Sequence, residues 1–294
     1  PVTATLPSAP VDIGGQLEAA LKTFWRHWKA CFPLAFIPQL LALVPLLPLL
    51  GFEQGDDPLG TLEHMLAWYT RPLGWLLFLL TVLGQLFLYL ALCFRLGYRA
   101  RGQDPGWTRS ANAALSRYAA GLGSAALYLI VLMLALLPSL VLLGLAFSGT
   151  LGALMGTLAG LLGLLLMAPG AWWMVAAGLA LYCCILERTG AIASISRSLR
   201  LIRGHWWEAS AVLGVVLVAH LTVHTGASMV TGIVIGTSML GGDSLDILAP
   251  MRAMLALQLL MTPLAAWLQI WLSCGVLAIF NNRVLAEAAG TAAE

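Results

Sequence analysis

Residues 122–147 read LGSAALYLIVLMLALLPSLVLLGLAF and contain no Asp, Glu, Lys, Arg or His. A helix needs about 20 mostly apolar residues to cross the hydrocarbon core of a bilayer. This stretch is long enough. Its continuous apolar character also differs from the short alternating segments of a transmembrane β-strand. The stretch therefore predicts a transmembrane α-helix and indicates the class of the whole chain.

The composition of the 294 residues agrees with that class. Hydrophobic residues make up 60% of the chain and charged residues only 10%, whereas a soluble domain carries about 25% charge. The mean hydropathy is +0.90. Too few charged side chains are present to cover the surface of a soluble enzyme or of a nucleic-acid-binding protein. We therefore predict an all-α, polytopic helical membrane protein that does not bind nucleic acid.

Six apolar stretches are long enough to span a membrane. They are residues 31–51, 72–94 and 122–147, and segments within 151–186, 207–240 and 251–280. The first stretch follows about 30 polar and amphipathic residues and lacks a small-residue cleavage site, so we expect it to act as its own insertion signal.

The basic residues predict the orientation of these spans. With both termini placed in the cytoplasm, 13 of the 15 Lys and Arg residues fall on the inner side, and only Arg71 and Arg252 fall on the outer side. Basic loops are retained on the cytoplasmic face. We therefore predict a multi-pass membrane protein with both termini cytoplasmic.

The spans are also predicted to form three repeats within one membrane domain, residues 1–294. Each repeat is an amphipathic cytoplasmic helix followed by a transmembrane hairpin, at about 15–94, 107–186 and 190–281, before a polar tail at 282–294. Leu21, Leu115 and Leu199 occupy matching places in the amphipathic segments. Apolar spacings of three and four are typical of helices, and a basic face opposite aromatic residues suits a helix in the membrane interface.

The basic faces of these segments are predicted to contact the headgroups of membrane phospholipids. The residues concerned are Lys22, Arg26, Lys29, Arg109, Arg117, Arg197, Arg200 and Arg203. His27 and His205 each precede a Trp and lie near basic residues, so they are predicted to contact headgroups too.

The fourth span is predicted to break at Pro169–Gly170, because Pro lacks an N–H and Gly is conformationally permissive. Residues 151–168 could span the bilayer, re-enter it or protrude from it. Gly152, Gly156 and Gly160 recur every four residues, a spacing that lets helices approach closely in lipid. Packing within the chain is the favoured explanation, and a homo-oligomer interface is the alternative.

The region after this break resembles a known family. The matching residues are Pro169-Gly170-Ala171-Trp172-Trp173, Leu186-Glu187-Arg188, Ser198-Leu199 and Arg203-Gly204-His205-Trp206-Trp207. The stretch resembles the YciC-type family of bacterial inner-membrane proteins, and is similar to the membrane domain attached to some glycerophosphoryl diester phosphodiesterases. The resemblance covers residues 169–207. It implies an architecture and a location in the bacterial inner (cytoplasmic) membrane, but no catalytic residues.

Few polar side chains fall at membrane depth. His220 and His224 lie one turn apart in the fifth span, and Gln85, Gln258 and Gln269 interrupt other spans. Ionisable residues inside a membrane often mark functional sites, and paired histidines can bind a metal. Hydrogen bonding between helices is the favoured explanation, with a polar ligand site and metal ligation by His220 and His224 as alternatives. The five cysteines are expected to be small core residues.

Three functions are consistent with the sequence. The leading hypothesis is a membrane protein that interacts with lipid or a hydrophobic small molecule, in lipid or envelope homeostasis. The alternatives are a small-solute transporter or channel with a polar site near His220, His224 and the broken fourth span, and a metal- or haem-binding membrane enzyme. The chain shows no hydrolase or nucleotide-binding motif, which favours a non-enzyme. It indicates no particular cofactor.

Overall fold

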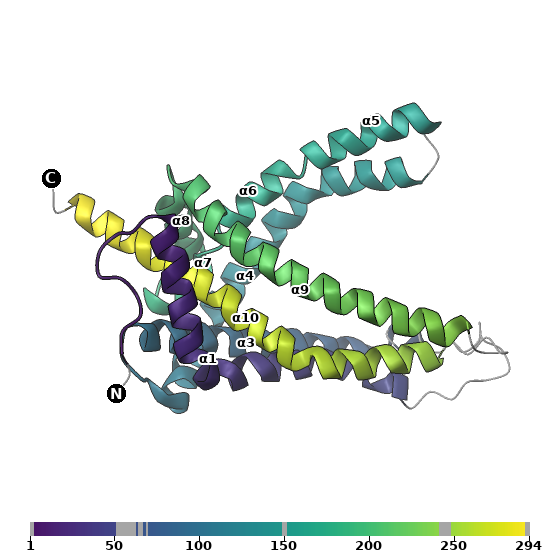
Figure 1. Ribbon diagram of the computed structural model, residues 1–294, viewed down its shortest axis with the longest axis horizontal. Helices are drawn as coiled ribbons and strands as arrows, with labels where there is room; N and C mark the ends of the chain where they lie inside the picture. The colour runs from purple at the N-terminus through teal and green to yellow at the C-terminus, as the bar shows by residue number, and fades with distance from the viewer. Residues whose placement is uncertain are drawn as a thin grey trace. The chain divides into compact units, whose positions relative to one another are not determined.

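The computed structural model describes residues 3–50, 63, 67–68, 70–148, 152–240 and 248–291. The described part of the chain is helical, without strands (Figure 1). Its elements are α1 (Ile13–Leu43), the 3-10 helix η1 (Val44–Leu50), α3 (Pro72–Ala100), α4 (Gly106–Phe147), α5 (Gly152–Leu165), α6 (Ala168–Ala176), α7 (Ala180–Leu186), α8 (Ala191–Ile202), α9 (Trp206–Leu240) and α10 (Leu248–Thr291).

Six helical segments in the described ranges are long and apolar enough to cross a membrane, which confirms the predicted number of spans. They are Ile13–Leu47, Pro72–Ala100, Gly106–Phe147, Leu154–Leu186, Trp206–Val223 and Arg252–Thr291. Large apolar side chains remain exposed along them, among them Leu134, Leu161 and Val218. Such a surface is costly in water and suits a lipid surrounding.

The amphipathic segments differ in how they join their spans. The first two are continuous with the following span, in α1 and α4, whereas the third is a separate helix, α8. Residues 282–291, predicted as part of a polar tail, continue α10.

The chain divides into two compact units, described separately below. Unit 1 comprises residues 1–5, 20–114 and 214–274, and unit 2 comprises residues 6–19, 115–213 and 275–294.

Unit 1 has a core built on one face of α1. Ala20, Thr23, Phe24, His27 and Cys31 are all buried at helical spacing. The ring of Phe24 meets those of Trp267 and Trp271 edge-on, at centroid distances of 4.6 and 5.6 Å. Aromatic pairs at this distance and angle are favourable.

Unit 2 contains a close antiparallel pairing of α4 with α5 and α6 (Figure 1). A Cβ atom added at Gly156 would lie 3.3 Å from the Ala146 carbonyl oxygen, and one at Gly163 would lie 3.0 Å from Leu143. The Ser139 hydroxyl donates to the Gly163 carbonyl at 2.7 Å. Gly156 and Gly163 therefore let α5 approach α4, and for Gly156 this agrees with the favoured explanation of packing within the chain.

The predicted homo-oligomer role of Gly152, Gly156 and Gly160 stays a prediction. The last two face Ala146 of the same chain, while Gly152 has a positive φ of 67° and open space around it. The nearest neighbour of Gly156 and of Gly160 is thus within the chain.

The fourth span is broken twice. The first break lies at residues 166–167, just before the predicted position, and Pro169 and Gly170 themselves belong to the first turn of α6. A Cβ at Gly170 would lie 2.3 Å from Leu136, so this glycine also permits close packing. The second break, at residues 177–179 between α6 and α7, was not predicted.

All five cysteines are buried and none forms a disulfide, as expected for small core residues.

Candidate functional site

The helix α8 is held in unit 2 by small polar side chains. The Ser198 hydroxyl donates to the Ala176 carbonyl at 2.8 Å and accepts from the Leu179 amide at 3.2 Å. The hydroxyls of Ser194 and Ser124 are 3.0 Å apart. Since these serines are buried together with Ile195, Leu201 and Ile202, the buried face of α8 packs on protein.

A tight turn follows α8 and positions an aromatic pair. Gly204 has a φ of 80°, in the left-handed region that other residues rarely adopt. The turn starts α9 at Trp206, whose indole Nε1 donates to the Trp172 carbonyl at 3.3 Å. The Gly204 turn thereby brings the start of α9 against α6.

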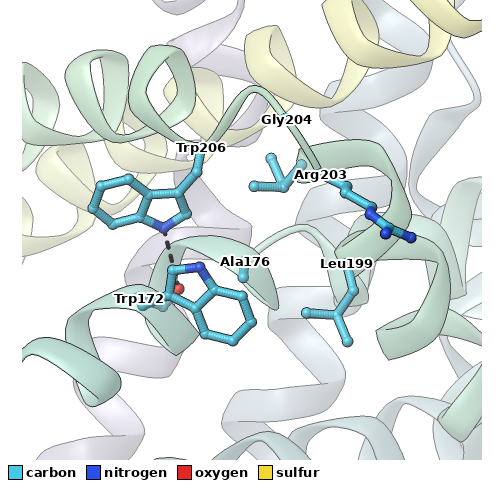
Figure 2. Close-up of a pocket in the computed structure, with 7 residues that line it drawn as sticks. Trp172, Ala176, Leu199, Arg203, Gly204 and Trp206 are labelled. Carbon is cyan, nitrogen blue, oxygen red and sulfur yellow. Dashed lines mark hydrogen bonds between the residues drawn. The ribbon is translucent and has the colours of Figure 1, made fainter.

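The turn forms one wall of a pocket of about 330 Å³ (Figure 2). Its lining residues are Trp172, Ala176, Leu199, Ile202, Arg203, Gly204 and Trp206. Figure 2 shows the two tryptophans close together on one side, with Leu199 and Arg203 on the other. The lining is therefore mainly apolar and aromatic, with a single cationic side chain, that of Arg203, which is exposed.

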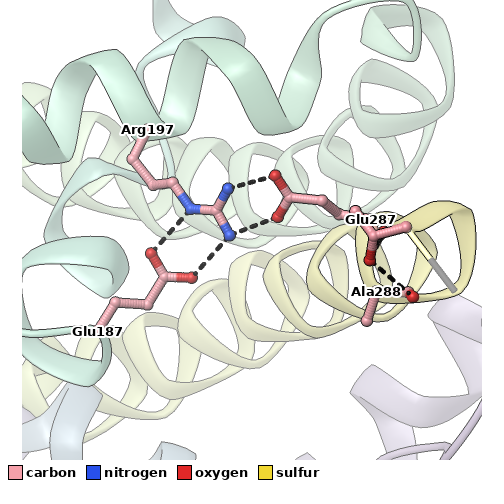
Figure 3. Close-up of polar contacts among 5 residues, drawn as sticks. Glu187, Arg197, Glu287 and Ala288 are labelled. Carbon is pink, nitrogen blue, oxygen red and sulfur yellow. Dashed lines mark hydrogen bonds and ion pairs between the residues drawn. The ribbon is translucent and has the colours of Figure 1, made fainter.

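A second feature of unit 2 is an ion-pair group that we name the Arg197 clasp, made of Glu187, Arg197 and Glu287 (Figure 3). The guanidinium donates to Glu187 from Nε at 3.0 Å and from Nη2 at 3.2 Å. It donates to Glu287 from Nη1 at 2.6 Å. The hydrogen bonds that Arg197 donates to Glu287 and to Glu187 raise its pKa above the ordinary value of an arginine.

Arg197, a predicted headgroup contact, is therefore committed to two carboxylates. A headgroup phosphate would have to compete with both of them. Arg200 and Arg203 are exposed, so they are better placed for the predicted contact.

A neighbouring ion pair joins α9 to α10 within unit 2. Glu208 accepts from the buried guanidinium of Arg283 and lies 3.2 Å from His205 Nδ1. His205 is exposed, as its predicted headgroup contact requires.

The predicted basic contacts of the first segment are exposed on α1. Lys22, Arg26 and Lys29 all face outward, and the Lys29 ammonium lies 5.7 Å from the centre of the Trp28 ring. The prediction for His27 is wrong, because its side chain belongs to the buried face of α1 and is only 3% exposed.

The basic residues of the middle segment lie on α4. Arg109 is exposed and its guanidinium is 5.3 Å from the centre of the Tyr98 ring. Arg117 is half-buried in unit 2.

The polar residues predicted at membrane depth all belong to unit 1. The Gln85 amide donates to the Pro38 carbonyl at 3.3 Å and so links α3 to α1. Gln258, Gln269 and His220 are half-buried. The side chain of His224 lies outside the described part.

Among the described residues, no group of three or more His, Cys, Asp and Glu side chains could hold a metal ion. Metal ligation by His220 and His224 stays a prediction, because the side chain of His224 is not included.

The structure also buries a basic residue, Arg95, that sequence reasoning missed. Arg95 was counted only as one of the cytoplasmic charges, yet it is 5% exposed and its guanidinium lies 4.1 Å from the centre of the Trp107 ring. No local signal in the sequence distinguishes it from its exposed neighbour Arg101.

Comparison with known proteins finds no matching family model, curated protein or solved structure. The residues that the structure describes define the class: they are helical, without strands, and include six helices long and apolar enough to span a membrane.

Proposed function

We propose that this protein binds anionic phospholipid at the cytoplasmic face of a bacterial inner membrane, in a role in lipid or envelope homeostasis. The pocket lined by Trp172, Leu199, Arg203 and Trp206 carries the proposal. We further propose that the chain is of the YciC type, that it contains three repeats and that both of its termini lie in the cytoplasm.

The chemistry of the pocket supports a lipid ligand. Tryptophan rings favour the membrane interface, where one edge meets hydrocarbon and the indole N–H meets polar groups. An exposed arginine binds phosphate through several N–H donors held in a plane. Arg203 is therefore suited to the headgroup, and Leu199 with the tryptophans to the adjoining glycerol and acyl carbons.

Nearby charge supports the same ligand. Arg200 is exposed in the last turn of α8, and Arg203 is the residue that caps the end of this helix. Each basic residue near an anionic membrane surface contributes about 1 kcal/mol to attraction. The Arg197 clasp contributes little to this attraction, because two carboxylates already neutralise its guanidinium.

Binding of the full-length protein to vesicles of phosphatidylglycerol or phosphatidylcholine tests the proposal. We expect Arg203→Gln to weaken the preference for phosphatidylglycerol about fivefold, the equivalent of about 1 kcal/mol. Arg188→Gln is the matched control, since Arg188 is exposed but does not line the pocket. Equal losses for both variants, or no loss for Arg203→Gln, would contradict a specific site.

The transporter hypothesis and the metal- or haem-enzyme hypothesis stay predictions. Both depend on His220 and His224, and no contact between described residues favours either one over the lipid-binding function.

A further inference from the structure

The buried Arg95 of unit 1 has more hydrogen-bonding capacity than its surroundings satisfy. Its Nε and Nη1 atoms are buried and have no hydrogen-bond partner among the described residues. Nη2 lies 3.8 Å from Asp104 Oδ1, which is close enough for an ion pair but too far for a good hydrogen bond. Stacking on Trp107 fixes the plane of the guanidinium without using its N–H groups.

A second arginine shares the same carboxylate. Arg99 donates from Nη1 to Asp104 Oδ2, and its Nε atom is buried without a partner in the part of the chain that the structure describes. Two guanidinium groups therefore face one carboxylate. Buried charges are normally paired, because an unpaired charge loses its hydration without compensation.

A third group with unused donors adjoins this pair. His27 is buried, interacts electrostatically with Arg99, Arg26 and Asp104, and has no hydrogen-bond partner at either ring nitrogen within the described ranges. An imidazole always has at least one N–H to donate. The cluster of His27, Arg95 and Arg99 thus combines excess positive charge with unused donors.

The N-terminus of α4 strengthens the positive potential at the same place. The helix begins at Gly106, whose amide donates to Asp104 Oδ1 at 3.2 Å. Gly106 has a φ of 70°, so the chain can turn there and direct that amide at the carboxylate. The first turn of a helix presents free N–H groups and a positive dipole end, and so attracts anions.

Asp104 is the accessible member of this group. Its side chain is 42% exposed and lies on the short connection between α3 and α4, whereas the side chains of Arg95 and Arg99 are largely enclosed. A ligand from solvent or from the membrane surface could therefore replace the Asp104 carboxylate without disturbing the packing of α3.

We propose that His27, Arg95, Arg99 and the first turn of α4 form a binding site for a phosphate-type oxyanion, with Asp104 as the internal counter-ion that the ligand displaces. A tetrahedral phosphate presents more acceptor oxygens than the carboxylate and carries more charge, so it satisfies donors that Asp104 leaves unused. The ligand is either free phosphate or the phosphate of a lipid headgroup. The site lies in unit 1 and is independent of the pocket proposed above.

Phosphate binding to the purified full-length protein provides the first test, by calorimetry and by the shift in melting temperature. We expect Asp104→Asn to tighten the binding of inorganic phosphate about tenfold, because one competing charge-assisted interaction is removed. We expect Arg99→Gln to weaken it by a similar factor. Arg101→Gln is the matched control, because Arg101 is an exposed arginine two residues away, and it should leave the affinity unchanged.

The gain of affinity in Asp104→Asn protects the test against misfolding, since an unfolded variant would lose binding. The proposal is overturned if Asp104→Asn tightens the binding of neither inorganic phosphate nor phosphatidic acid, or if Arg99→Gln and Arg101→Gln behave alike.

Vesicles distinguish the two sources of the phosphate. The same variants are compared on vesicles of phosphatidylcholine with and without phosphatidic acid. If Asp104→Asn strengthens binding to phosphatidic acid and free phosphate competes only weakly, the ligand is a lipid headgroup. If Asp104→Asn strengthens the binding of free phosphate alone, the ligand is soluble. Either result supports the site. If the variant changes the binding of neither ligand, the proposal is overturned. Because Arg203→Gln leaves this cluster intact, failure of the pocket proposal would be recognised separately.

Discussion

The Arg197 clasp of unit 2 and the basic cluster of unit 1 use the same residue types in opposite proportions. In the clasp, one arginine faces two glutamates and its N–H groups are engaged on two sides. In the basic cluster, two arginines face one aspartate, and buried donor atoms have no partner among the described residues. The first arrangement suits a structural cross-link, and the second suits the capture of an additional anion.

The largest expected effect is the loss of the arginine from the clasp. Arg197→Ala would leave Glu187 and Glu287 facing each other across the lost guanidinium. We expect the free energy of unfolding to fall by roughly 2–3 kcal/mol, less than for a fully buried pair because both carboxylates are partly exposed. Denaturation in detergent would measure the change, with Arg200→Ala as the exposed control on the same helix.

Removing the carboxylate from the basic cluster should have the next largest effect. Asp104→Asn would leave Arg95 and Arg99 without their counter-ion, and we expect a loss of about 1 kcal/mol, limited by the exposure of Asp104. Added phosphate should restore the melting temperature of this variant. A variant more stable than the wild type would contradict the excess of positive charge that we infer.

Acid should remove the stabilisation that the Asp104 carboxylate contributes to the folded protein. Burial acts to raise the pKa of Asp104, but hydrogen bonds from the Gly106 amide and Arg99 outweigh it and hold that pKa below its ordinary value of 3.8. Stabilisation by Asp104 is therefore complete above that value and is lost as the pH falls through the lower pKa of the folded protein. The melting temperatures of wild type and Asp104→Asn should differ at pH 7, begin to approach each other near pH 3.8 and become equal once the pH is below the lower pKa of the folded protein. A difference that persisted there would need another cause.

The smallest effect should follow removal of one acid from the clasp. In Glu287→Gln, Arg197 keeps both hydrogen bonds to Glu187. The charge interaction that is lost is weak, because Glu287 is exposed and water screens it. We expect a loss of about 0.5 kcal/mol. A loss as large as that of Arg197→Ala would mean that the two carboxylates do not share the arginine as described.

The sequence predicted the spans well, because length and continuous apolar composition are sufficient to identify a helix that crosses a bilayer. The break near Pro169 was equally predictable, since proline removes a hydrogen-bond donor at a known position. The second break, at residues 177–179, contains Gly178 but no proline, and one glycine within an apolar helix gives a weaker signal.

The charged clusters were harder to predict. Glu287 is 90 residues from Arg197, so only the tertiary fold brings them together. The helical spacing of α1 was recognised, but the spacing alone did not show that His27, predicted to contact headgroups, belongs to the buried face. Arg95 near the end of α3 has the same local sequence character as its exposed neighbours, and its burial depends on Trp107 and the start of α4.

The five buried thiols bear on how the topology of this protein can be measured. A thiol enclosed by side chains reacts slowly with a maleimide added from outside. The natural protein should therefore give little background labelling. A single reporter cysteine at an exposed site such as Arg101 or Arg71 would then show, in intact or opened cells, which side of the membrane each connection faces.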